Sequence, residues 1–214
     1  MSQLPPAGTS PKEFFEVHVP KAFAANSLSD EAKQVDVTLA VKLDGPGGGE
    51  WSFHLKEGSL TVAPGSTDDA AFTVVQSVDD WRGALWEGRG GAFGKQAQAL
   101  FTPGAGAGAG AGGMSPAALA PLQALRGVIK MVVTGDQGGD WAVAFKLGPG
   151  PVPPQPTTTV SISAADAAAL ERGELDPMQA FMSGRIQVTG DMALLMQMQA
   201  IQMQAAAAAQ SSKT

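Results

Sequence analysis

The feature that most constrains the fold is an alternation of apolar and polar residues with a period of two. It runs from Val35 to Leu43 and resumes from Trp51 to Leu55, after the glycine-rich loop 44–50. Successive side chains of a strand point to opposite faces, so this pattern predicts strands with one buried face. The loop between them predicts that the two strands pair antiparallel.

Further strands are expected where short apolar runs lie between turn residues. They are Ser59–Ala63, Ala71–Gln76, Val128–Thr134, Asp140–Leu147 and Thr157–Ser163. Tight turns separate the first four strands of the chain, so we expect these four to form a meander.

Helices are expected where apolar residues recur every three or four positions. Ser77 and Asp79 are candidate N-caps of one helix. An alanine-rich helix is expected to open with Ala164-Ala165-Asp166, to run to Arg172 and to stop at Gly173. A short amphipathic helix is expected after the first proline-rich residues, ending near Pro20.

A low-complexity tract of glycine and alanine divides the chain. Having nothing to bury, this tract is predicted to be a flexible insert, and a helix is expected to begin after it at Ser115-Pro116. The expected organisation is a loose arm over 1–11, one fold over 12–204 with halves 12–102 and 114–204 around the insert 103–113, and a tail over 205–214.

The two halves also resemble each other. The segment Gly48–Lys56 has a counterpart in Gly138–Lys146, and Thr73–Ser77 has one in Thr159–Ser163. The order is the same in both copies, so the sequence predicts a duplicated meander-plus-helix module. Chance matches of small residues in an alanine- and glycine-rich chain are the alternative.

Composition excludes several kinds of site. The chain has no cysteine, which rules out disulfides and zinc-thiolate sites. Its two histidines, His18 and His54, lie on separate segments and are too few for an imidazole-built metal site. A net charge of −6 would repel a phosphate backbone, so nucleic acid is a poor candidate partner. No metal and no cofactor are expected.

The sequence shows neither a basic segment followed by an apolar run at its start nor an apolar stretch of the roughly 20 residues that a membrane span needs. We therefore expect a cytoplasmic protein without stable membrane insertion.

No catalytic constellation stands out. The acidic pairs Asp68-Asp69 and Asp79-Asp80 stand at a turn and at a helix start, where carboxylates cap backbone amides. The chain contains no Gly-x-Ser-x-Gly elbow, and no serine has a histidine nearby in a suitable setting. We expect that the chain is not an enzyme.

The last expected helix, 191–209, carries two apolar stripes. At about 100° per residue, Met192, Met196 and Met203 form one stripe, and Leu194, Met198 and Ile201 form the other on nearly the opposite side. Two apolar stripes need two apolar neighbours, which we interpret as the sheet and a ligand cavity. Methionine adapts to apolar ligands of different shape. The alternative is that the methionine face is plain core or a dimer surface.

The segment Gly173–Leu194 resembles the C-terminal signature of the sterol carrier protein type 2 family: a short helix, an edge strand and a C-terminal helix. The likeness covers Met114–Gln204. It implies an α+β fold in which a mostly antiparallel twisted sheet is covered on one face by helices. It also implies an apolar tunnel between the two layers. The first half lacks the Thr-Gly-Asp strand end and the long final helix.

The resemblance and the two stripes together lead to a non-catalytic function, the binding and carriage or presentation of fatty acids, acyl-coenzyme A or sterol-like molecules. Arg172 or Arg185 could meet an acidic head group. A protein-interaction or oligomerisation module built on the methionine-rich helix is the alternative, and a homodimer is compatible with both. The residues expected to line the site are Phe181, Met182, Ile186, Met192, Leu195, Met196 and Met203.

Overall fold

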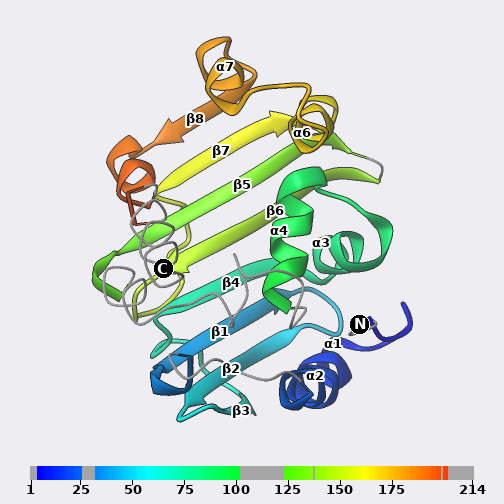
Figure 1. Cartoon of the computed structure of the whole chain (residues 1–214), viewed down its shortest axis with the longest axis vertical. Helices are drawn as coiled ribbons and strands as arrows, with labels where there is room; N and C mark the ends of the chain where they lie inside the picture. The colour runs from blue at the N-terminus through cyan, green and yellow to red at the C-terminus, as the bar shows by residue number, and fades with distance from the viewer. Residues whose placement is uncertain (1–3, 26–31, 102–122, 137, 199, 202–214) are drawn as a thin grey trace, which may run out of the picture.

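The computed structural model of the chain describes residues 4–25, 32–101, 123–136, 138–198 and 200–201. They form an eight-stranded sheet in the order β3-β2-β1-β4-β6-β5-β7-β8 (Figure 1). The strands are β1 (Asp36–Asp44), β2 (Gly49–Lys56), β3 (Ser59–Pro64), β4 (Phe72–Ser77), β5 (Gly127–Asp136), β6 (Gly139–Leu147), β7 (Thr158–Ser163) and β8 (Ile186–Gly190).

Short helices connect these strands. They are α1 (Pro11–Glu13), η1 (Phe14–His18), α2 (Val19–Ala24), η2 (Ala32–Gln34), α3 (Val78–Arg82), η3 (Gly83–Glu87), α4 (Gly91–Phe101), α6 (Ala164–Glu171) and α7 (Pro177–Met182). Residues 192–198 are helical as well. The insert 103–113, the start of the helix expected at Ser115-Pro116, Met203 and the tail 205–214 lie outside the described residues.

The predicted fold class is confirmed. Five of the seven strand pairings are antiparallel, and the pairings of β1 with β4 and of β5 with β7 are parallel. The buried side chains of the strands, among them Val41, Trp51 and Val133, form one cluster with residues of the helices. The helices lie over one face of the sheet (Figure 1). The result is a two-layer α+β structure.

The predicted four-strand meander is wrong. β4 does not pair with β3 but returns beside β1, in a parallel register that places Leu39 next to Phe72. Burial explains this order, because three of the six residues of β4 are buried whereas none of β3 is. A strand with so much buried surface belongs inside a sheet, and a largely exposed strand is suited to its edge.

The second half repeats these strand directions. β5 pairs antiparallel with β6 and parallel with β7, as β1 does with β2 and β4. Ser77 at the end of β4 and Ser163 at the end of β7 each cap the following helix. Their hydroxyls accept the backbone N–H of Asp80 at 2.9 Å and of Asp166 at 3.1 Å. The N-cap predicted at Ser77 is confirmed. β4 and β6 join the halves into one sheet.

Aromatic rings fill the space between sheet and helices in the first half. The rings of Phe15 and Trp51 are 4.9 Å apart, and those of Phe14 and Trp81 are 5.2 Å apart. Trp81 is in turn 5.2 Å from Trp86. The first pair is tilted and the other two are edge-to-face, and such large rings in contact pack this region densely.

Two features of the N-terminal region differ from the prediction. The helix does not end near Pro20 but continues to Ala24, and Pro20 follows directly on the π-helical turn η1, where the α-helical hydrogen-bond pattern is already interrupted. The arm is not loose over its described part, since Arg82 donates hydrogen bonds to the carbonyl groups of Ala7 and Thr9 at 2.7 and 3.2 Å.

Candidate functional site

The end of β8 fixes the start of the helix at 192–198. The Asp191 carboxylate accepts the N–H of Ala193 at 2.8 Å, which makes it the N-cap. The Asp191 carbonyl accepts the hydroxyl of Thr158 at 2.6 Å. Gly190 has a φ of +95° and leaves no room for a Cβ, which would lie 2.2 Å from the Thr157 carbonyl oxygen. These contacts explain why the strand ends in Gly190-Asp191, the Gly-Asp end of the signature.

Beneath this helix lies a group of apolar side chains that we name the C-terminal apolar cluster. Its buried members are Ile129, Leu147, Val160 and Leu194, and its partly buried members are Phe72, Leu125, Ile186, Val188, Leu195 and Met198. These side chains offer a contact area for an apolar ligand.

The six predicted site residues within the described part occupy two environments. Ile186 and Leu195 are partly buried members of the C-terminal apolar cluster. The other four have exposed side chains, as judged by their relative accessibilities of 42% for Phe181, 81% for Met182, 42% for Met192 and 66% for Met196.

The two stripes of the last helix are in different surroundings. Leu194 is 4% and Ile201 is 9% exposed, and Met198 is in the cluster with Leu194, so this stripe packs on the sheet. A Cβ on Gly127 would lie 2.7 Å from a Leu194 methyl, which shows how closely the helix approaches β5. The Met192 and Met196 stripe faces outward.

The prediction from sequence did not include Val160 and Val188, although they belong to the cluster. The alternation of the strand at 157–163 was the signal for Val160. The strand at 186–190 carried a similar but shorter pattern for Val188.

The arginines considered for an acidic head group are both bound to carboxylates of the chain. Arg185 lies 3.1 Å from Asp166, and Arg172 lies 2.8 Å from Glu174. The Arg172 guanidinium lowers the pKa of Glu174 by hydrogen bonding to it. Both arginines therefore take part in local ion pairs at the surface.

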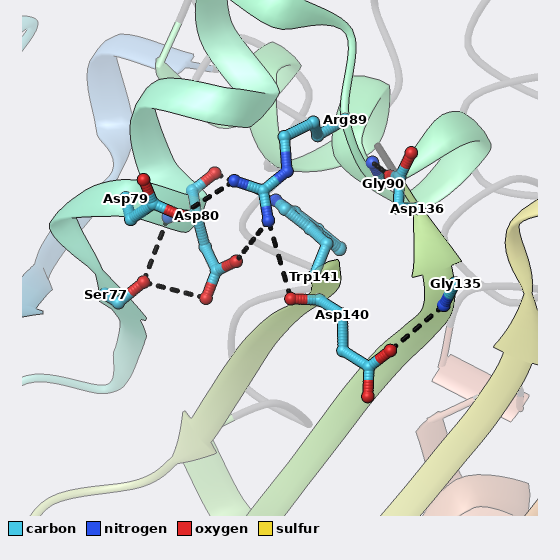
Figure 2. Close-up of polar contacts among 9 residues, drawn as sticks. All are labelled: Ser77, Asp79, Asp80, Arg89, Gly90, Gly135, Asp136, Asp140 and Trp141. Carbon is cyan, nitrogen blue, oxygen red and sulfur yellow. Dashed lines mark hydrogen bonds and ion pairs between the residues drawn. The ribbon is translucent and has the colours of Figure 1, made fainter. Parts of the chain in front are cut away.

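A polar cluster around Arg89 joins the two halves (Figure 2). The Arg89 side chain is only 6% exposed and lies 2.8 Å from Asp79 and 3.6 Å from Asp80. The indole of Trp141 donates to the Asp80 carbonyl at 2.8 Å. Asp136, at the end of β5, accepts the N–H of Gly90 at 2.6 Å.

The charged groups of this polar cluster pair with one another, as in a structural ion-pair network. Burial raises the pKa of Asp80, while the hydrogen bond from Ser77 opposes that rise. The hydrogen bond to Asp79 raises the pKa of Arg89, so the guanidinium stays charged. The capping role predicted for the Asp79-Asp80 pair is wrong, because Ser77 is the N-cap of α3 and the two carboxylates lie in its first turn, where they pair with Arg89.

The structure also shows a hollow of about 490 Å³ in the first half, away from the predicted site. It is lined by Pro20, Phe23, Ala24, Lys33, Glu57, Gly58, Ser59 and Leu60. Within the described ranges, no three His, Asp or Glu side chains come together as metal ligands. In the same part of the chain, no helix is long and apolar enough to cross a membrane.

A sheet covered on one face by helices, with apolar side chains clustered under its C-terminal helix, is suited to holding an apolar ligand. A family model described as the SCP-2 sterol transfer family matches residues 110–203. The resemblance found in the sequence is confirmed for this segment. The family assignment supports lipid binding or transfer as the function of the second half.

Solved structures give more distant likenesses. The sterol carrier protein domain 2 of Helicoverpa armigera is 28% identical, over 41% of this chain and 74% of that one, with a TM-score of 0.31. Sterol carrier protein 2 like 2 from Aedes aegypti is 23% identical, over 33% and 68%, with a TM-score of 0.25.

A stereoselective inverting sec-alkylsulfatase from Pseudomonas sp. is 13% identical, over 89% of this chain and 16% of that enzyme, with a TM-score of 0.21. No curated protein matches the chain. All three TM-scores are below 0.5, so the assignment rests on the family model.

Proposed function

We propose that this chain binds and carries an apolar lipid, a fatty acid, acyl-coenzyme A or sterol-like molecule, on the helix-covered face of β5, β7 and β8. The match of residues 110–203 to the SCP-2 sterol transfer family is the observation that carries the proposal. The C-terminal apolar cluster supports it, because its partly buried members lie where the family resemblance implies a tunnel.

Within this site, Ile186 and Leu195 would contact the ligand directly. Phe181, Met182, Met192 and Met196 would form the rim through which it enters, and Met203 would extend the same stripe. Unbranched methionine side chains at a rim would adapt to ligands of different shape.

The energetics of such a site need no specific polar contact. Removing a methylene from water gains about 0.8 kcal/mol, so about ten buried methylenes would give micromolar binding after the cost of association. The aromatic packing of the first half supports a single site, because the rings of Phe15, Trp51 and Trp81 occupy the corresponding layer there.

Two further predictions belong to this proposal. The common strand order of the halves supports a duplication, and the match to a sterol transfer family supports a carrier without catalysis of its own. Cytoplasmic location stays a prediction of the sequence.

Titration of the delipidated chain with a fluorescent fatty acid tests the proposal. Saturable binding is expected, and Leu195→Ala should weaken it about fivefold, since about 1 kcal/mol of apolar contact would be lost. Val62→Ala on β3 is the matched control and should leave the affinity unchanged. A flat titration with acyl and sterol probes would refute the proposal.

A further inference from the structure

Large apolar side chains that are exposed gather around one strand. Among the described residues six such side chains are exposed, and five of them lie between Met178 and Met196. Met178, Phe181 and Met182 precede β8 on α7, and Met192 and Met196 follow it on the next helix. Figure 1 shows α7 and this helix at opposite ends of β8.

Among the described residues, β8 is an edge strand without a neighbour on its outer side. It pairs with β7 on one side and ends the strand order of the sheet. Its sequence, Ile-Gln-Val-Thr-Gly, contains no proline and no charge, which are the usual protections of an edge. The opposite edge strand β3 ends in a proline and has α2 against it.

The exposed side chains of α7 are held in place. Asp176 caps this helix by accepting the N–H groups of Met178 and Gln179 at 2.9 and 3.0 Å. Ala180, on the inner side, is fully buried. Arg185 after the helix is bound to Asp166, so α7 presents an uncharged surface.

We propose that a second copy of this chain covers this surface, by antiparallel pairing of β8 with the β8 of its partner. Around a twofold axis near Val188, the start of one β8 lies beside the end of the other. The α7 of each copy then faces the helix at 192–198 of the other. One symmetric contact thus covers both groups of exposed side chains in both copies.

The area agrees with such a contact. The five side chains have relative accessibilities between 42% and 81%. With a large side chain presenting on the order of 200 Å², they expose about 600 Å² per copy. A stable interface buries about 800 Å² per partner, and the edges of β8 would contribute the remainder.

The dimer would cover side chains that the proposed function places at the rim of the lipid site, but it is tested by the mass in solution, which needs no bound lipid. Sedimentation equilibrium of the full chain over a concentration series should give twice 21.8 kDa. Met182→Glu and Met196→Lys should each weaken the dimer at least about tenfold, because a charge would be buried against methionine. The double variant M182E/M196K should restore it, because the new charges attract each other across the axis.

Val17→Glu is the control, since Val17 is equally exposed but lies on η1, and it should leave the dimer intact. The variant Q187K/T189K should dissociate it by placing like charges opposite each other on paired strands. A monomeric wild-type chain overturns the proposal. Flotation of that monomer with phosphatidylcholine vesicles, abolished by Met182→Glu, would assign the surface to a lipid bilayer instead. An unaltered dimer in M182E also overturns the proposal.

Discussion

Replacing Arg89 by methionine should cost about 3 kcal/mol of unfolding free energy at pH 7. The pair with Asp80 carries most of this cost, because both side chains are little exposed, at 6% and 15%. Removing one partner of a buried pair costs about 3–5 kcal/mol. Asp79 is 83% exposed, so its pair with Arg89 adds at most about 1 kcal/mol. The distance of 3.6 Å between the Arg89 guanidinium and the Asp80 carboxylate is long for an ion pair, which favours a cost near about 3 kcal/mol and not about 5.

The loss should depend on pH. Burial raises the pKa of Asp80 in the folded chain, and losing the Arg89 charge raises it further. A carboxyl whose folded pKa is raised is tolerated best when it is protonated. Its destabilising effect is therefore absent below its unfolded pKa and fully developed above its folded pKa. The deficit of R89M should thus shrink as the pH falls through the raised pKa of Asp80 and be smallest below the unfolded pKa of about 4.

Urea unfolding at pH 7 and at acidic pH measures both effects. The second variant R89M/D80N should recover part of the lost stability at pH 7, because no buried charge then remains at position 80. Equal deficits of R89M at both pH values, or no recovery in the double variant, would refute this reasoning.

Three further predictions concern stability, each measured by chemical denaturation. Gly190→Ala should cost about 3 kcal/mol, because its φ is +95° and the new Cβ would lie 2.2 Å from a backbone oxygen; a loss below about 1 kcal/mol would contradict this. Leu194→Ala should cost about 3 kcal/mol, whereas Met196→Ala should stay within about 0.5, and similar losses would mean that the wrong stripe was assigned to the sheet. Ser77→Ala and Ser163→Ala should each cost about 1 kcal/mol through the lost N-cap, and an unchanged stability in either would argue against that cap.

The sequence predicts the strands well because their alternation is set by burial. The run from Val35 to Leu43 became β1, and the glycine-rich loop after it gave the expected antiparallel hairpin. Their order in the sheet was not predictable in the same way. A period of two shows which face of a strand is buried but not which strand lies beside it, so the place of β4 next to β1 was missed.

The site was predictable in part for a similar reason. Helical spacing separates the stripe of Leu194 from that of Met196, yet both stripes are apolar. Only the packing against β5 and β7 shows that the Leu194 stripe is the inner one. The Arg89 cluster was missed because its members are distant in sequence and meet only when the hairpin of β5 and β6 reaches α3.

The continuation of the first helix past Pro20 has a local cause. A proline usually ends a helix, but here the π-helical turn from Phe14 to His18 directly precedes Pro20 and already interrupts the α-helical hydrogen-bond pattern, so the helix continues. Sequence periodicity does not distinguish such a turn from a helix end.

Native mass spectrometry of the chain as purified tests the proposed lipid carriage most directly. The account predicts a population heavier than the 21.8 kDa chain by the mass of one retained apolar molecule, which organic extraction removes. A chain that carries no such mass, and acquires none when it is mixed with fatty acids and sterols, would contradict it.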